Sequence, residues 1–273
     1  MKKWILFVAL AVTMSILAAC GGDEASSSAE DKKEVTIGAT SGPYSDMVTK
    51  AIKPGLEEKG YTVEVKEFSD YIQPNNALAQ GDLDANLFQH KIYMETFAKQ
   101  HNMDLSEVIV VPTAPMGIYS QKFDSIEDIK EGSAIAIPND PTNAARAFQI
   151  LEDAKLITLK PDTDPLTVSE KDIAENVKNL QFKPIEAAQL PRAVDSVDLS
   201  AVPGNYALAA DMDLLDALQL EDMPDQYRNR VVVNTKDVDS QLAKDIKAVV
   251  EADEFEKIID EEFKGFGKPE WME

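Results

Sequence analysis

Cysteine, histidine and positive charge are all scarce in this chain. Its 273 residues include one cysteine, two histidines, and 27 Lys and Arg against 49 Asp and Glu, which gives a formal net charge of −22. One cysteine rules out a disulfide framework and a cysteine-based zinc site, and two separated histidines make a poor metal cluster. Nucleic acid requires basic patches, so this acidic surface argues against it as a partner. The surface also disfavours direct adhesion to anionic lipid.

Catalytic motifs are lacking as well. The sequence has no Gly-x-Ser-x-Gly elbow, no P-loop, no His-Glu-x-x-His and no dinucleotide-binding glycine run. Only His90 and His101 are available as histidine bases. The segment Asp82–Asn86 begins like a calcium loop, but Leu87 stands where the turn needs glycine and Tyr93 where a bidentate glutamate belongs. We therefore expect no enzymatic activity, no cofactor and no metal site.

The N-terminal residues are typical of an exported lipoprotein. Lys2 and Lys3 precede an apolar run from Trp4 to Leu17, which is shorter than the roughly 20 apolar residues of a membrane-spanning helix. A short apolar run behind basic residues and before small ones is typical of a cleaved secretory signal. Leu17-Ala18-Ala19-Cys20 resembles the lipobox of bacterial lipoproteins, in which the cysteine is acylated. We expect residues 1–19 to be the signal peptide and Cys20 to carry the lipid, palmitate included.

The residues after Cys20 are small, polar or charged, so we expect residues 20–33 to form the lipidated cysteine and a flexible tether. One acyl chain binds membranes only marginally, and stable anchoring implies the multiply acylated lipoprotein end. The sequence thus predicts a protein held on the extracytoplasmic face of the cell membrane through its N-terminal lipid only.

Strand and helix patterns alternate after the tether, which is typical of α/β domains with largely parallel sheets. The expected strands are Val35–Ala39, Tyr61–Val65, Ala85–Phe88, Ala134–Ile137, Leu180–Pro184 and Leu199–Val202. The expected helices run from Ser45 to Glu58, from Asn75 to Gln80, through Tyr93 and Phe97, from near Thr142, from near Glu186 and from Gln241 to Phe263. Gly60 and Gly81 are expected to end the first two helices.

Two crossings are expected to divide this α/β chain into two lobes. Val108–Tyr119 is apolar and β-rich, but Pro112 and Pro115 suit a bent connection better than a central strand. Arg230–Asn234 is expected to be the return crossing. The predicted lobes are residues 34–114 plus 231–273 for lobe 1 and residues 115–230 for lobe 2. Open α/β sheets bind ligands at the carboxyl ends of their strands, so a ligand cleft is predicted between the lobes, with hinge closure around the ligand.

Polar and aromatic side chains follow the expected strands at this cleft. They are Tyr71, Phe88, His90 and Tyr93 in lobe 1, and Asn143, Arg146 and Asn205 in lobe 2. A free amino acid needs both kinds of group. Its carboxylate suits Arg146, whose planar fork matches two oxygens near a helix N-terminus. Its ammonium needs acceptors such as Asn205 or Asn143. A thioether suits the aromatic rings, each contact contributing roughly 0.3–1.5 kcal/mol.

Each of these residues also has an ordinary structural interpretation. The aromatic side chains are typical of a hydrophobic core, and His90 is typical of a helix cap. Arg146 can pair with Glu152 or another acid on the surface, and Asn205 follows a glycine as turn residues often do.

The order and spacing of short motifs carry more information than any single residue. The motifs are Ile37-Gly38-Ala39-Thr40, Asp70-Tyr71, Asn75-Asn76-Ala77-Leu78, Phe88-Gln89-His90, Ala114-Pro115-Met116-Gly117-Ile118-Tyr119-Ser120, Ile137-Pro138-Asn139-Asp140-Pro141-Thr142-Asn143, Ala187-Ala188-Gln189-Leu190-Pro191-Arg192 and Gly204-Asn205-Tyr206-Ala207. With them, the chain from Val35 to its C-terminus resembles the methionine-binding lipoproteins of the NlpA family, the substrate-binding components of methionine ABC importers.

This resemblance implies a two-lobed periplasmic-binding-protein-like fold (type II) that grips L-methionine between its lobes. It also implies delivery of the ligand to an ABC permease and its ATPase. The pocket residues that it implies are Tyr71, Phe88, His90 and Tyr93. It implies that Arg146 holds the ligand carboxylate and that Asn205 helps to bind the amino acid backbone, with Asn143 as a further ligand-binding residue. Because the function needs free lobes, we expect a monomer.

Four positions depart from the family pattern. Ile92 stands where a proline is common, Tyr44 where a histidine is common, and Ala144-Ala145 where an acidic residue and a glycine are usual. Such changes can reshape the pocket. The alternative is therefore the same fold and role with another cargo: D-methionine, methionine sulfoxide, a methionine-containing dipeptide or another apolar amino acid.

Overall fold

Two five-stranded sheets organise residues 34–272, the part of the chain that the computed structural model describes. The predicted signal peptide, Cys20 and the tether lie outside these residues. Within them, no helix combines the length and apolarity that crossing a bilayer requires. The same residues contain no group of three or more His, Cys, Asp and Glu side chains arranged to hold a metal ion.

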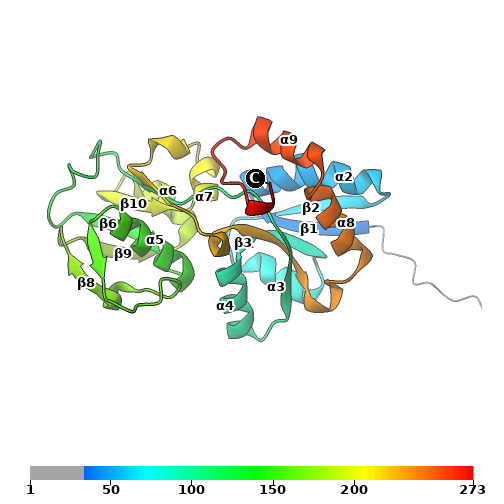
Figure 1. The fold of residues 1–273 in the computed structure, drawn as a ribbon, viewed down its shortest axis with the longest axis horizontal. Coiled ribbons are helices and arrows are strands. Elements are labelled where there is room, and N and C mark those ends of the chain that lie inside the picture. Colours follow the sequence, from blue (N-terminus) through cyan, green and yellow to red (C-terminus); the bar gives the residue numbers. More distant parts are fainter. Residues whose placement is uncertain (1–33, 273) are drawn as a thin grey trace, which may run out of the picture. The chain divides into compact units, whose positions relative to one another are not determined.

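The sheet of lobe 1 has the strand order β2-β1-β3-β12-β4 (Figure 1). Its strands are β1 (Glu34–Thr40), β2 (Thr62–Phe68), β3 (Ala85–His90), β4 (Leu105–Val110) and β12 (Asn229–Asn234). Strand β1 pairs in parallel with β2 and β3, whereas β12 runs antiparallel between β3 and β4. Strand β12, from residues 229–234, therefore lies inside a sheet that is otherwise built from residues 34–110.

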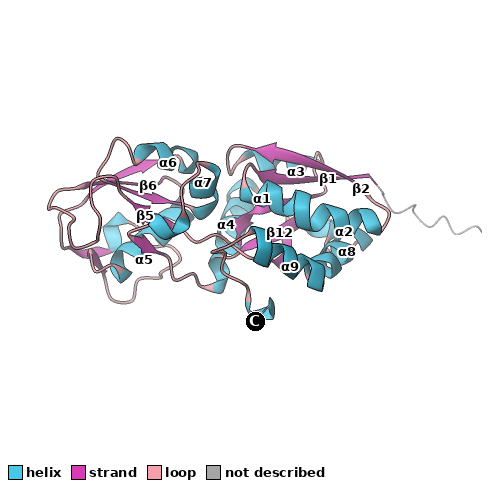
Figure 2. Ribbon diagram, turned by 90° about the horizontal axis from the view of Figure 1, so that it is seen from above, coloured by secondary structure: helices cyan, strands magenta, loops and turns pink. Residues whose placement is uncertain are grey.

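Helices cover both faces of this sheet (Figures 1 and 2). They are α1 (Pro43–Met47), α2 (Lys53–Glu58), α3 (Gln73–Gln80), α4 (Lys91–His101), α8 (Gln241–Val250) and α9 (Asp253–Glu262). Fully buried apolar side chains such as Ile37, Leu56 and Ile246 form the core beneath α1, α2, α8 and α9. Gly60 and Gly81 both have positive φ at the ends of α2 and α3, as the sequence predicts.

The sheet of lobe 2 has the strand order β11-β5-β10-β6-β9. Its strands are β5 (Gly117–Tyr119), β6 (Ala134–Pro138), β9 (Gln181–Ile185), β10 (Leu199–Val202) and β11 (Gln219–Leu220), with helices α5 (Pro141–Asp153), α6 (Leu190–Ala193) and α7 (Gly204–Ala209). A separate hairpin joins β7 (Ile157–Leu159) to β8 (Ile173–Asn176). Strands β10, β6 and β9 are mutually parallel neighbours, so their carboxyl ends share one edge of the sheet.

The structure corrects one predicted crossing. The first crossing is the segment 111–116 between β4 and β5, and it contains both prolines. Arg230–Asn234, expected to be the return crossing, instead belongs to β12, and the return passes through residues 221–228. Val231 and Val233 of β12 are buried in the core of lobe 1. An apolar β-rich run fits a sheet interior and a buried crossing equally well, which is why the pattern did not separate them. The lobe limit predicted at 230/231 falls inside this strand.

Two predicted helices are interrupted. The helix expected over Ser45–Glu58 contains a π-helical turn, Val48–Ile52, between α1 and α2. Pro54 in the first turn of α2 has no N–H to donate to the preceding turn, so the regular α-helical hydrogen-bond pattern is interrupted next to the π-helical turn. The segment expected as one helix over Gln241–Phe263 is two, α8 and α9, because Ala252 adopts an extended backbone between them.

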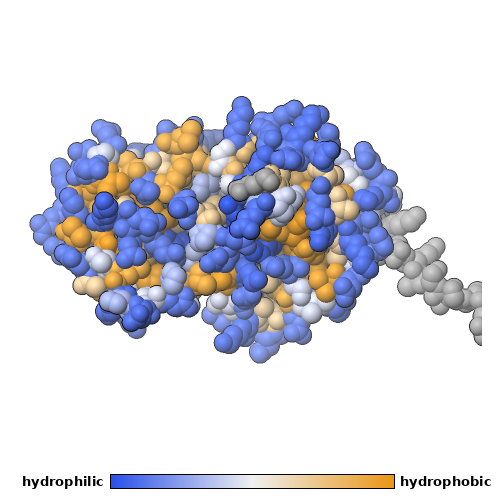
Figure 3. Space-filling model, viewed as in Figure 1, coloured by the Kyte–Doolittle hydropathy of each residue, from blue (hydrophilic) through white to orange (hydrophobic). Residues whose placement is uncertain are grey.

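The face drawn in Figure 3 is mainly hydrophilic, with smaller hydrophobic patches between the polar residues. Within residues 34–272, the large apolar side chains with more than a third of their surface exposed are Ile72, Val177, Leu215 and Trp271. The acidic, well-solvated surface expected from the composition is consistent with this distribution.

Candidate functional site

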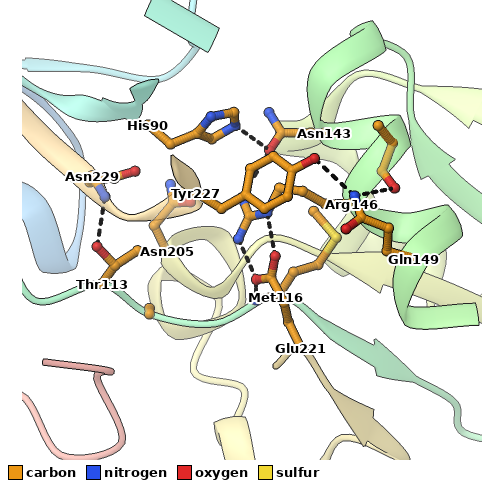
Figure 4. A network of polar contacts seen from close by, with 12 residues as sticks. His90, Thr113, Met116, Asn143, Arg146, Gln149, Asn205, Glu221, Tyr227 and Asn229 are labelled. Carbon is orange, nitrogen blue, oxygen red and sulfur yellow. Dashed lines mark hydrogen bonds and ion pairs between the residues drawn. The ribbon is translucent and has the colours of Figure 1, made fainter. Parts of the chain in front are cut away.

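One cavity between the lobes brings together all seven residues that the sequence singles out. Its empty space is about 320 Å³, part of it open to solvent, and it is lined by Tyr44, Tyr71, Phe88, Gln89, His90, Tyr93, Thr113, Ala114, Asn143, Arg146, Pro203, Gly204, Asn205 and Asn229. Part of its polar lining is drawn in Figure 4. That these residues bind a ligand remains a prediction.

Strand ends and helix starts position the lining residues. Phe88 and His90 end β3, and Arg146 lies in the second turn of α5, which follows β6. Asp140 caps α5 because its side chain accepts the backbone N–H of Asn143 at 2.9 Å. Asn205 is in the first turn of α7, directly after β10. The cleft thus forms where the carboxyl ends of strands from both sheets meet, as expected for α/β sheets.

Gly204 allows the first crossing to approach α7 closely. A Cβ atom at this position would lie 2.3 Å from the carbonyl oxygen of Pro115 and 2.7 Å from the side chain of Ala114. Any other residue would therefore push the crossing away from the cavity. Close packing against the first crossing therefore explains the glycine of the Gly-Asn-Tyr-Ala motif.

Aromatic rings form one wall of the cavity. Ring centroids of Tyr71, Phe88 and Tyr93 lie 5.9–6.0 Å from one another, and the ring of Tyr206 from lobe 2 lies 5.0 Å from that of Tyr71. The Tyr93 hydroxyl donates to the carbonyl oxygen of Tyr71 at 3.0 Å, which fixes the two rings relative to each other. Burial raises the pKa of Tyr71 well above its ordinary value, so its hydroxyl is a donor. This wall offers flat, polarizable surface to an apolar side chain.

Asn205 has a hydrogen-bond donor that no described residue uses. Its Oδ1 accepts the hydroxyl of Tyr71 at 2.6 Å, whereas its buried Nδ2 has no partner within residues 34–272. A buried amide N–H without a partner costs about 1–3 kcal/mol. Because the residue lines the cavity, an acceptor on a ligand is the natural partner for this donor.

Arg146 is held from one side by a buried acid that the sequence reasoning did not identify. Its Nε and Nη2 donate to the two carboxylate oxygens of Glu221 at 2.8 and 2.6 Å, and the side chains are only 6% and 5% exposed. Nη1 donates to Asn143 Oδ1 at 2.9 Å. Arginine has five N–H groups, so one N–H on each terminal nitrogen remains for another acceptor. Burial alone would lower the pKa of Arg146, but the charge and hydrogen bonds of Glu221 outweigh this effect and raise the pKa above its ordinary value. The guanidinium therefore stays charged.

His90 is a neutral helix cap that also contacts lobe 2. Its Nδ1 accepts the backbone N–H of Tyr93 at 3.1 Å and caps α4, so the ring proton is on Nε2, 3.3 Å from Asn143 Oδ1. Burial, with the nearby charge of Arg146, holds the pKa of His90 well below its ordinary value. The capping role that the sequence left open is therefore present, and the same ring lines the cavity.

Several lining residues were missed by sequence reasoning. Asn229 begins β12, donates its backbone N–H to Thr113 Oγ1 at 2.7 Å, and donates Nδ2 to the carbonyl oxygen of Phe88 at 3.0 Å. Its Oδ1 makes no hydrogen bond to the described residues and is available as an acceptor. Tyr227 does not line the cavity, but its ring centroid lies 5.4 Å from the Arg146 guanidinium. Tyr44, noted in the sequence only as a departure, lines the cavity too. Residues of the return crossing had no sequence signal, because that crossing was placed elsewhere.

Comparison with known proteins places this chain in a family. The model of the NlpA lipoprotein family matches residues 35–271. The chain belongs to the NlpA lipoprotein family. The probable D-methionine-binding lipoprotein MetQ of Pasteurella multocida is 35% identical over 272 residues, which cover 97% of both chains. The type II periplasmic-binding-protein-like fold and the lipoprotein character predicted from the sequence agree with this assignment, as does the expectation that the chain is not an enzyme.

Solved structures of NlpA relatives agree with the fold. A nutrient binding protein from Burkholderia cenocepacia bound to methionine has a TM-score of 0.80 and 38% identity, covering 85% of this chain and 97% of that one. An ABC transporter periplasmic substrate-binding protein from Coxiella burnetii has a TM-score of 0.81 and 34% identity, covering 86% of this chain and all of that one.

Proposed function

We propose that this NlpA-family chain captures methionine, preferentially the L enantiomer, and delivers it to the permease and ATPase of an ABC importer. Support comes from relatives whose names or structures refer to methionine and to ABC transport. The MetQ relative is named for D-methionine, so D-methionine is the second candidate cargo. Further candidates are methionine sulfoxide, a methionine-containing dipeptide and another apolar amino acid.

The observation that best supports the proposal is the unpaired Nδ2 donor of Asn205. In a cavity of about 320 Å³, this unpaired Nδ2 lies on the same lining as the two remaining N–H groups of Arg146, so a carboxylate can satisfy all three. Asn229 Oδ1 and the aromatic wall are then available for an ammonium group and for an apolar side chain. A zwitterion with a thioether side chain matches each of these features.

The location of the protein belongs to the same proposal. An importer needs its binding protein on the extracytoplasmic face, and acylation of Cys20 would hold it there through the N-terminal lipid. We also propose a monomer, because both lobes must be free to close on the ligand.

Ligand-dependent thermal unfolding tests the cargo. The full chain, purified in detergent and refolded to remove carried-over ligand, is titrated with L-methionine, D-methionine, methionine sulfoxide, methionine dipeptides and leucine. At 100 times its dissociation constant, a ligand that binds only the native state stabilises by about 2.7 kcal/mol. We expect the largest shift with L-methionine and its loss in Asn205→Ala.

Asn76→Ala is the matched control, since Asn76 lies on α3 and does not line the cavity. A larger shift with D-methionine or another cargo would keep the transport role and overturn the enantiomer or the substrate. No shift with any amino acid would overturn the proposed function.

A further inference from the structure

The positive charge in the cavity lining is paired with a carboxylate that lies outside the lining. Among the lining residues, Arg146 alone carries a formal charge, because His90 is neutral. Glu221 does not line the cavity, yet it occupies the Nε side of the guanidinium with both oxygens, at 2.8 and 2.6 Å. The cationic residue that faces the ligand is thus half of a neutral pair.

The two crossings between the lobes hold Glu221 in place, and no ligand is needed for this. It directly follows β11 at the start of the return crossing, and its Oε2 also accepts the backbone N–H of Met116 in the first crossing at 3.1 Å. A carboxylate that accepts three N–H groups while 5% exposed has little freedom to leave. An incoming carboxylate therefore does not replace Glu221, whose contacts with Arg146 are drawn in Figure 4, and must use the N–H groups that remain on the guanidinium.

We propose that Glu221 is a specificity-determining residue that makes the cavity select net-neutral zwitterions over carboxylate anions. The proposal rests on the proposed amino acid capture. With the pair intact, a zwitterion adds no net charge to the buried site, whereas an anion brings one uncompensated charge, which is costly in a low-dielectric cavity. Without Glu221, the site carries a net positive charge that an anion neutralises.

A ligand pair that differs in one group tests this directly. Methionine and its 2-hydroxy analogue have the same side chain and carboxylate, but the ammonium is replaced by a hydroxyl. Dissociation constants of both are measured for wild type and Glu221→Gln, in the full chain purified in detergent. A unit charge at several ångströms and an effective dielectric near 20 changes affinity about tenfold or more. We therefore expect the affinity ratio of methionine to hydroxy acid to fall at least about tenfold in Glu221→Gln.

Glu107→Gln is the matched control. Glu107 also pairs with a buried arginine, Arg230, at 2.5 Å, but neither residue lines the cavity. The ratio should be unchanged in this variant. An equal loss of affinity for both ligands in Glu221→Gln, with the ratio preserved, would show that Glu221 only supports the fold and would overturn the inference.

Chemical rescue covers the case in which Glu221→Gln does not fold. Glu221→Ala leaves room for a small carboxylate, so added formate is expected to restore its unfolding transition and its preference for methionine. Failure of formate to restore either would overturn the inference. If wild type binds no amino acid, the proposed function fails by itself. A gain of hydroxy-acid binding in Glu221→Gln would then still support the charge argument, and no gain would overturn it.

Discussion

The buried ring of His90 makes the stability of the protein depend on pH in a predictable direction. In the folded protein, Nδ1 is used as the cap of α4 and Nε2 donates towards Asn143. The pKa of His90 lies well below its ordinary value because burial and the charge of Arg146 disfavour the imidazolium. The unfolded chain has no such constraint and takes up a proton near pH 6.5.

The sign follows from this difference. Below the unfolded pKa, the unfolded state binds a proton that the folded state does not, so stability is fully present above about pH 6.5 and is lost as the pH falls. One pH unit below the unfolded value, the loss from a single such histidine reaches up to about 1.4 kcal/mol. Between pH 7.5 and 5.5, wild type should therefore lose up to about 1.4 kcal/mol more stability than His90→Asn, in which asparagine keeps an acceptor for the helix cap.

Urea unfolding at pH 7.5, 6.5 and 5.5 measures this directly. The chain offers a matched control, because its second histidine, His101, is exposed at the end of α4. His101→Asn should keep the pH dependence of wild type, while His90→Asn should flatten it. Identical slopes for wild type and His90→Asn would refute the assignment of His90 as a buried neutral cap.

Two further predictions concern the core and the anchor. The Asn75 side chain makes three hydrogen bonds within a buried amide cluster, to and from Gln89 at 2.8 and 2.7 Å and from Asn86 at 3.0 Å, so Asn75→Ala should cost about 3 kcal/mol and lower Tm by about 6–12 °C; a thermal scan in which it matches Asn76→Ala would contradict this. The wild-type chain should take up label from an alkyne fatty acid in cells and Cys20→Ser should not, and equal labelling of the two would refute lipidation at this residue.

The sequence predicts which residues line the cavity better than it predicts the charged partners of those residues. Strand patterns followed by polar or aromatic residues place Tyr71, His90 and Asn205 at strand ends, and strand ends of α/β sheets meet at one edge. This local logic needs no knowledge of distant contacts. It is why the seven candidate residues line one cavity.

Long-range partners could not be predicted in the same way. Glu221 is 75 residues from Arg146, and the chain has 49 acidic residues that could pair with a given arginine. The role of β12 depended on which sheet had space for an apolar strand, a property of the tertiary fold and not of residues 229–234. Asn229 was missed for the same reason, since it enters the cavity only because β12 inserts between β3 and β4.

Three hydrogen-bond contacts join the lobes at or beside the cavity, and two of them are made by residues that line it. Tyr71 donates to Asn205 at 2.6 Å, His90 lies 3.3 Å from Asn143, and the Tyr206 hydroxyl donates to a backbone carbonyl of lobe 1 at 3.2 Å. At about 0.5–1.5 kcal/mol net for each bond, the three together stabilise the closed arrangement by only a few kcal/mol.

Reversing a two-state population from 1:99 to 99:1 needs about 5.5 kcal/mol of differential affinity. These three bonds are too weak to achieve that without a ligand. Under the proposed function, a ligand carboxylate on Arg146 and Asn205 would add charge-assisted contacts to lobe 2, and the aromatic wall of lobe 1 would hold the side chain. Such a ligand contacts both lobes only when they are closed. We therefore expect closure to be driven by ligands that contact both lobes at once, and we expect Glu221→Gln to change which net charge the closed cavity accepts.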